Sequence, residues 1–183
     1  MFTVAEFAEV DEPVGWFYEL CDGAVVRAPW HTPEHQLARA ELWEQIHSCL
    51  PVGVLAVPGA HLDLCLARPD GPGTVRRPDI VVIDIEAYRR ANREWKALRA
   101  DEVLLAVEVM SVASRHTDRV IKRAEYAAAG IERYWLVDLD APVSLLPMRR
   151  VDDLGYVEDG EVTGDGAVDG PFAVRLKLAE LVR

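Results

Sequence analysis

"VLLAVEVMSVASRHTDRVIKRAEYAAAGIERYWLVDL", residues 103–139, decides the fold of this chain. The segment opens with an apolar run of strand length, residues 103–110, and closes with a second run at 133–139. Between them the pattern predicts a helix at about 117–129, with Gly130 as the residue that ends it. A strand, a helix and a strand at this spacing predict a right-handed crossover between two parallel strands. The chain is therefore expected to have an α/β fold.

The segments before this crossover predict a hairpin and a second helix. Residues 16–29 contain an Asp-Gly turn signal between two short apolar stretches, which is typical of a hairpin. A helix is expected at about 33–48, because Thr32 is a good N-cap and a proline suits the first helical position. Its apolar face consists of Leu42, Ile46 and Cys49, extended toward the N-terminus by His35, Ala38 and Arg39.

Two further strands are expected before the crossover. Residues 60–67 alternate, with Leu62, Leu64 and Leu66 on one side of a half-buried strand. Residues 76–84 predict a more apolar strand that pairs with it as a hairpin. Residues 86–99 are polar and basic and predict a short helix or an exposed loop, and the C-terminal part predicts strands joined by acidic turns.

The composition is that of an ordinary globular domain. The chain has 183 residues, of which 50% are hydrophobic and 28% charged, so we expect one domain over 1–183 with a mixed β-sheet flanked by a few helices. No apolar run approaches the roughly 20 residues of a membrane span, and the acidic N-terminus lacks the regions of a signal peptide. A cytoplasmic protein without a membrane segment is expected. The three widely spaced cysteines indicate neither a disulfide framework nor a zinc knuckle.

The distribution of charge bears on nucleic-acid binding. The formal net charge of −11 argues against a chain that coats nucleic acid by bulk attraction. The acids are concentrated in residues 151–170, which contain no lysine or arginine, whereas residues 89–99 and 115–123 are rich in bases. The middle of the chain therefore offers two locally basic segments.

Two carboxylates and one lysine carry the strongest chemical signal. Asp79 opens the apolar strand "DIVVI", and Glu108 lies in the middle of "LLAVEVM". A carboxylate inside such a run is costly to bury, so Glu108 either faces solvent from an edge strand or has a positive partner. Lys122, in the following helix, could reach it along the sheet edge. Two acids and a lysine brought together in this way would form a magnesium-type site that organises a phosphate and an attacking water.

The helix pattern also allows a purely structural interpretation. Its expected core face consists of Val120, Ala124, Ala127 and Ala128. The opposite, polar face consists of Asp118, Lys122, Glu125 and Tyr126. In that arrangement Asp118 and Lys122 would be an ordinary i, i+4 pair on the surface of a helix.

The remaining candidates are weaker when taken from the residues alone. His31 and His35 are four residues apart, but the cap and proline between them disrupt a helical ligand pair, so zinc is not expected. Glu19 lies in a hairpin strand, where an exposed acid is the usual explanation. The chain has neither a P-loop nor a G-x-G-x-x-G motif, so nothing supports a nucleotide cofactor.

The order of these features resembles the Uma-type family of restriction endonucleases, a branch of the PD-(D/E)XK nuclease superfamily. The similar segments cover nearly the whole chain: "YELCDGAVV", "HTPEHQLARAELWEQI", "RRPDIVVID", "LLAVEVMSVASRHTDRVIKRAEYAAAGIERYWLVDLD" and "FAVRLKLAEL". The resemblance implies a restriction-endonuclease-like core, with a mixed sheet flanked by helices. It also implies a divalent metal ion, Mg²⁺ or Mn²⁺, and hydrolysis of phosphodiester bonds.

The resemblance assigns roles to individual positions. Asp79 and Glu108 match the acidic metal ligands, joined by the backbone carbonyl of Val109. Met110 stands where the superfamily has a lysine, and in the Uma type that lysine has moved to the following helix, which matches Lys122. The lysine is expected to support the transition state of phosphodiester hydrolysis.

The resemblance also adds two residues and a substrate. Glu19 and His35 match an acid and a histidine near the N-terminus of the family and are implied members of the catalytic site. The implied activity is a magnesium-dependent endodeoxyribonuclease that cuts DNA, and a homodimer with two-fold symmetry would suit a duplex. The alternative is a nuclease-like fold that no longer cuts and acts as a binding or regulatory protein. The net charge and the displaced lysine favour that alternative.

Overall fold

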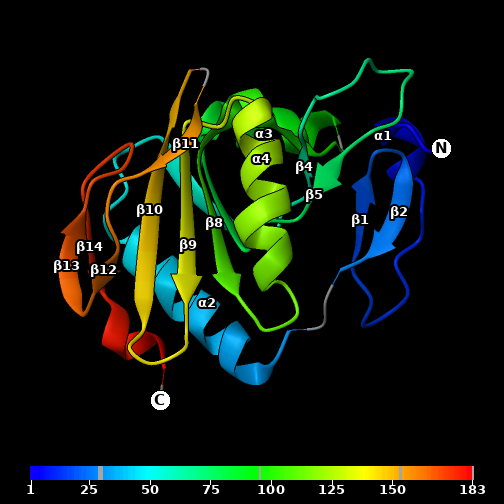
Figure 1. The fold of residues 1–183 in the computed structure, drawn as a ribbon. Helices are drawn as coiled ribbons and strands as arrows, with labels where there is room; N and C mark the ends of the chain where they lie inside the picture. Colours follow the sequence, from blue (N-terminus) through cyan, green and yellow to red (C-terminus); the bar gives the residue numbers. More distant parts are fainter. Residues whose placement is uncertain (29–30, 95, 153, 183) are drawn as a thin grey trace.

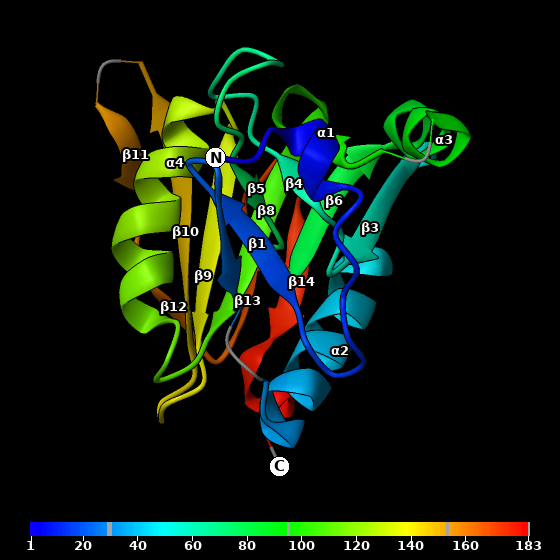
Figure 2. The same cartoon turned by 90° about the vertical axis from the view of Figure 1, so that its right-hand side faces the viewer.

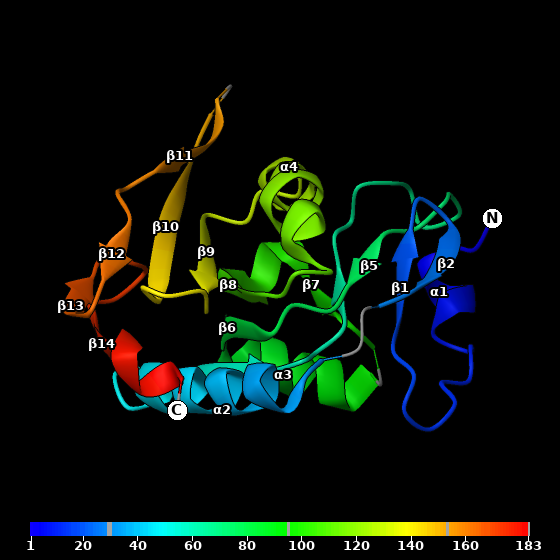
Figure 3. The ribbon, with the colours of Figure 1, turned by 60° about the horizontal axis from the view of Figure 1, so that its bottom comes forward.

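The computed structural model describes residues 1–28, 31–94, 96–152 and 154–182. Its main feature is a mixed sheet with helices on both faces, which confirms the expected class of fold (Figures 1 and 3). Helix α2 (Pro33–His47) covers one face and helix α4 (Arg123–Ala128) the other. In spatial order the strands are β11 (Gly155–Glu158), β10 (Ser144–Val151), β9 (Arg133–Asp138), β8 (Val103–Met110), β6 (Ile80–Asp84) and β3 (Val54–Pro58), and β12 (Val162–Thr163) also pairs with β10.

The predicted crossover is confirmed. Strands β8 and β9 are parallel neighbours, with Glu108 opposite Leu136. The helical connection begins with a π-helical segment, η2 (Thr117–Lys122), and continues as α4. It ends at Gly130, whose φ of +84° lies in the left-handed region that favours glycine. The sheet therefore brings the end of β8 and the first turns of the helix together.

Helix α2 is fixed by its N-terminal sequence. Thr32 is the N-cap, and its side-chain oxygen accepts the backbone N–H of His35 at 3.2 Å. The buried face of the helix is the predicted one, except that Cys49 lies beyond the helix and Arg39 is only partly buried, and it shares one core cluster with residues of β8 and β9. The fully buried members of that contact are Ala38, Leu42 and Ile46 from α2 and Val107, Val109 and Trp135 from the sheet.

A smaller sheet lies beside the main one, on the side that Figure 2 faces. Its strands, in order, are β2 (Ala24–Arg27), β1 (Tyr18–Cys21), β5 (Val75–Arg76), β4 (Leu62–Asp63) and β7 (Leu98–Arg99). The predicted hairpin is β1–β2, and both turn residues, Asp22 and Gly23, have positive φ. The other elements are α1 (Val4–Phe7), α3 (Ile85–Glu94), η1 (Ala100–Glu102), β13 (Asp165–Val168), β14 (Val174–Lys177) and η3 (Leu178–Leu181). Within the described ranges, every helix is too short or too polar to cross a membrane.

The predicted hairpin of residues 60–67 and 76–84 is wrong in part. The first strand is only β4, because Cys65 has a φ of +53° that turns the chain and leaves Leu66 43% exposed. The second segment contributes to two sheets: β5 pairs with β4, whereas β6 pairs with β3 and β8. Pro78 lies between β5 and β6, and its missing N–H is typical of a place where a strand ends. Residues 86–94, expected as a helix or a loop, belong to α3.

The predicted faces of the second helix are reversed, except that Ala127 is partly buried against the core as predicted. Val120 is 54% exposed and Ala124 and Ala128 are also exposed, whereas Asp118, Lys122 and Tyr126 are buried. The polar face turns inward because its members satisfy one another. Lys122 pairs with acids, and the Tyr126 hydroxyl donates to a buried carboxylate while its ring fills the core. The Asp118–Lys122 pair, expected on the surface, is therefore internal.

Candidate active site

Asp79 lies directly before β6, where the chain passes from the smaller sheet to the main one. Strand β6 runs antiparallel to β8, with Ile80 opposite Val107, so Asp79 reaches the same end of the sheet as Glu108. Its carboxylate is 4% exposed, and Oδ2 accepts the backbone N–H of Val109 at 2.9 Å. This bond fixes the carboxylate beside the end of β8.

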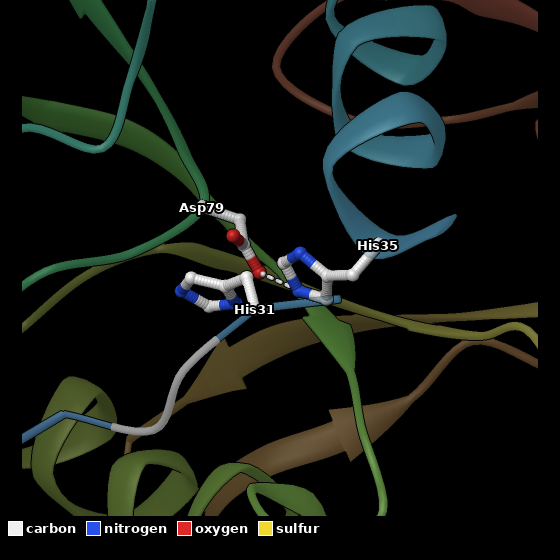
Figure 4. A group of neighbouring side chains, drawn as sticks. All are labelled: His31, His35 and Asp79. Carbon is white, nitrogen blue, oxygen red and sulfur yellow. Dashed lines mark ion pairs between the residues drawn. The ribbon is translucent and has the colours of Figure 1, made fainter. Parts of the chain in front are cut away.

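His35, in the first turn of α2, meets this carboxylate from the other side. Its Nε2 lies 3.2 Å from Asp79 Oδ2 (Figure 4). The same nitrogen lies 2.8 Å from the carbonyl oxygen of Val109. Since a carbonyl oxygen only accepts, Nε2 carries a hydrogen. Its other ring nitrogen, Nδ1, is buried and has no hydrogen-bond partner within the described ranges. The histidine thus touches two of the three atoms implied as metal ligands.

His31 completes a compact group of donor atoms. Its ring stacks on that of His35, with centroids 4.1 Å apart. One donor atom from each of His31, His35 and Asp79 lies within 4.8 Å of the other two, a spacing at which a metal ion could be held. Glu108 is not part of this group. As expected, His31 and His35 do not form a ligand pair within one helix, because α2 begins only at Pro33; the two rings meet because His31 folds back from outside the helix.

Burial and hydrogen bonding set the charges of this group. Burial alone would raise the pKa of Asp79, but the contacts with His35 and with the Val109 N–H outweigh burial and lower it. Burial alone would lower the pKa of His35, yet Asp79 and the Val109 carbonyl raise it. Burial lowers the pKa of His31. Asp79 is therefore ionised at neutral pH, and its carboxylate favours the protonated form of the His35 imidazole.

Glu108 points to the opposite face of the sheet from Val109, toward the π-helical segment. It is 3% exposed and lies in a central strand, so the edge-strand explanation fails. Its Oε1 accepts from Lys122 Nζ and from the Tyr126 hydroxyl, both at 2.8 Å. The positive partner that the sequence required is Lys122, from the helix after the loop.

Two more buried acids surround the same ammonium group. Glu19 Oε1 lies 3.5 Å and Asp118 Oδ1 lies 3.4 Å from Lys122 Nζ. Glu19 is not the exposed strand acid of the usual explanation, because it is 5% exposed and accepts from Arg76 at 2.9 Å and from the Arg77 N–H at 3.0 Å. Lys122 is thus enclosed by three carboxylates.

The cluster holds an excess of negative charge. Burial raises the pKa of Glu108 to about 8; Lys122 opposes this shift, and the charges of Asp118 and Asp79 add to it. Burial also raises the pKa of Asp118, whereas Lys122 and Arg76 overcome burial and lower that of Glu19. Lys122 and Arg76 together cannot compensate three close carboxylates in addition to Glu125, which also pairs with Arg76, so the cluster retains a proton on Glu108 at neutral pH.

The donor set fits a divalent cation. Among the described residues, the buried acids are Glu19, Asp79, Glu108 and Asp118, and the buried permanent cations are Arg76 and Lys122. With all four acids ionised, two negative charges exceed the two cations, and a divalent ion that displaced the retained proton would compensate them. Carboxylate and carbonyl oxygens suit Mg²⁺, and imidazole nitrogens suit transition metals such as Mn²⁺ better than Mg²⁺.

The two basic segments, 89–99 and 115–123, differ in their position relative to the buried acids. In 115–123, Arg115 pairs with Asp138 at 2.6 Å and Arg123 with Glu158 at 2.8 Å, so these guanidiniums already have acidic partners. In 89–99, Arg90 pairs with Glu102 at 2.5 Å and Arg99 with Asp101 at 3.1 Å, and the segment contains none of the buried acids. Of the two segments, only 115–123 adjoins the buried acids.

The sequence interpretation missed Asp118, Tyr126 and Arg76 as members of the site. Asp118, Lys122 and Tyr126 recur at intervals of four residues, which is the signal that places them on one helix face. Arg76 is 4% exposed, donates to both carboxylate oxygens of Glu125 at 2.7 Å, and also holds Glu19. Its neighbours come from distant parts of the chain, so no local pattern indicates it.

The fold and the buried acids together define a mixed α/β protein with an acidic site at one end of its central sheet. Residues 4–165 match the sequence model of the family described as "Uma2: Putative restriction endonuclease", and the chain belongs to this family. No curated protein matches the chain.

A solved structure supports the fold. The chain is similar to a crystal structure described as a "putative nuclease belonging to DUF820" from Anabaena variabilis ATCC 29413. The TM-score is 0.71 and the sequence identity 18%, and the alignment covers 99% of this chain and 97% of the other. At this identity the likeness shows the shared fold.

Proposed function

We propose that this protein is a metal-dependent endonuclease that hydrolyses phosphodiester bonds of DNA. The observation that carries the proposal is the pairing of Glu108 with Lys122 at 2.8 Å, at the end of the sheet where Asp79 also lies. Burying an acid and a lysine to this extent costs free energy, and this cost is a reason to infer that they serve a functional site. Membership of a nuclease family directs this pairing toward nucleic acid.

We assign the metal to oxygen atoms of Asp79, Glu108 and Val109, with Mg²⁺ or Mn²⁺ as the ion. His31 and His35 lie close enough to Asp79 to add nitrogen ligands, and such ligands would favour Mn²⁺. A bound divalent ion supplies Lewis-acid activation of water and of the phosphodiester.

The protein's own side chains position and neutralise the reacting groups. Lys122 carries the positive charge that stabilises the negative charge developing on the phosphoryl oxygens. Glu19 and Asp118 hold that ammonium near Glu108. His35 holds the Val109 carbonyl and the Asp79 carboxylate in a fixed relation. Two copies of the chain related by a two-fold axis would present two such sites to a duplex.

The test is nicking of supercoiled plasmid DNA with Mg²⁺ or Mn²⁺. We expect nicking by the wild type and none by Asp79→Ala or Glu108→Ala, with Glu158→Ala as a control whose carboxylate is 49% exposed. Circular dichroism checks that each variant is folded. If calorimetry detects no metal binding to the folded wild type, the enzyme proposal is wrong.

A second candidate function is binding without cleavage. The observation that favours it is the enclosure of Lys122, which is 6% exposed and surrounded by three carboxylates. A lysine held in this way reaches a substrate only if the acids release it. Metal binding without cleavage over a broad panel of DNA and RNA substrates would favour a binding or regulatory protein.

A further inference from the structure

A small pocket adjoins Asp79 on the side of α2. Its volume is about 140 Å³, and we call it the arginine pocket. The residues that line it include Arg39, Gly59, Arg77 and Asp79. A single water needs roughly 10–15 Å³ of such volume, so the pocket has room for a larger polar group.

Gly59 lies next to both guanidiniums and leaves the space beside them free of a side chain. A Cβ on Gly59 would lie 3.6 Å from Arg39 Nη1 and 3.7 Å from Arg77 Nε. Its φ of +60° lies in the left-handed region, where side chains are rarely found. Two positive groups therefore converge on one point with no side chain between them.

Internal contacts do not account for both charges. Arg77 donates to the Gly59 carbonyl at 2.8 Å and pairs with Glu12 at 3.3 Å, and its guanidinium lies over the ring of Phe17. Arg39 Nη1 is 3.9 Å from Asp79 Oδ1, which is beyond hydrogen-bond distance. That carboxylate is already held by His35 and by a backbone N–H.

Arg39 is available to an external acceptor. Its side chain is 26% exposed, and among the residues that the structure describes one of its five N–H donors is paired, with Gln36 at 2.6 Å. A planar guanidinium matches the oxygens of a phosphate, often with two parallel hydrogen bonds. The chemistry that fits the arginine pocket is thus an anionic phosphodiester group.

We propose that the arginine pocket binds a phosphodiester group of the DNA that neighbours the phosphodiester group that is cut. The proposal rests on the proposed function, because Asp79 belongs both to the pocket and to the assigned metal ligands. Arg39 provides the main contact, and Arg77, fixed by Glu12 and Phe17, provides the second charge.

The test measures binding separately from cleavage. Fluorescence anisotropy of a labelled DNA duplex is recorded in EDTA between about 50 and 200 mM salt, where phosphate contacts determine the salt dependence. We expect Arg39→Ala to weaken binding about tenfold and to reduce the slope of log K against log salt by about 0.9. Gly59→Asn keeps both arginines and fills the pocket, and asparagine tolerates a positive φ, so it should weaken binding to a similar degree.

The control is Arg93→Ala, which removes a base from α3 at the far end of β6. The subsite proposal is wrong if Arg93→Ala weakens duplex binding as much as the pocket variants do, or if both pocket variants bind as tightly as the wild type. It is also wrong if the wild type does not bind the duplex at about 50 mM salt. If the wild type never cuts DNA but the pocket variants still bind the duplex more weakly, the phosphodiester subsite is supported and the endonuclease proposal is refuted.

Discussion

Replacing Glu108 by glutamine tests whether Glu108 is the group that stays protonated in the folded protein at neutral pH. The variant keeps an oxygen that accepts from Tyr126, but it removes the carboxyl group, whose pKa is raised from 4.5 to about 8. In the wild type the folded state therefore binds one proton more than the unfolded state between these two values. Stability from this group is fully present below about pH 4.5 and is lost as the pH rises toward 8.

The expected size follows from the proton count. One extra bound proton changes the free energy of unfolding by about 1.4 kcal/mol per pH unit. Between about pH 5.5 and 7.5, Glu108→Gln should gain roughly 2 kcal/mol of stability relative to the wild type. The gain is below the full slope because the folded carboxyl starts to lose its proton as the pH approaches 8.

The assay is urea unfolding followed by circular dichroism at both pH values, in EDTA, because a bound cation would hold Glu108 ionised. Tyr126→Phe is the matched control: it removes a donor to the same oxygen but leaves the titrating group, so its pH dependence should follow the wild type. If the stability difference between Glu108→Gln and the wild type is constant over pH, Glu108 is ionised throughout and Lys122 outweighs burial.

Three further predictions concern neighbouring residues. Lys122→Met leaves three buried carboxylates without their cation and should lower the free energy of unfolding by about 3 kcal/mol at pH 8, measured by urea unfolding; less than about 0.5 kcal/mol would contradict the enclosed ammonium. Thr32→Ala removes the N-cap of α2 and should cost about 1 kcal/mol in the same assay, whereas Thr32→Ser should restore it. Asp79→Asn should weaken Mn²⁺ binding by more than about a hundredfold in calorimetry, and an unchanged affinity would exclude this carboxylate as a ligand.

The parts of the fold that follow from local signals were predictable. The Asp-Gly turn, the Thr32 cap and Gly130 each satisfy a backbone requirement within a few residues, and the structure has the hairpin and both helices at those places. The division of residues 76–84 between two sheets was not predictable, because pairing partners lie far away in the chain. Pro78 marks the break, but a proline alone does not say which sheet each half joins.

The candidate site was predictable at Glu108 for a different reason. An acid in an apolar strand has a large energetic cost, so the sequence itself requires a compensating group. The group is Lys122, as the geometry shows. Nothing comparable points to His31 or Arg76, whose contacts depend on how loops and strands from separate segments meet.

The reversed helix face shows why hydrophobic periodicity fails near such a site. Val120 and Ala124 are small or moderately apolar, so exposing them costs little, whereas Tyr126 buries a large ring. Asp118 and Lys122 then enter with Tyr126 because they share its face, and their burial is tolerable only because Glu108 and Glu19 already lie opposite. The acid in β8 therefore decides the orientation of the helix. Met110 is consistent with this explanation. Its apolar side chain provides no cation at the end of β8, and Lys122 provides one because the polar face of the helix turns inward.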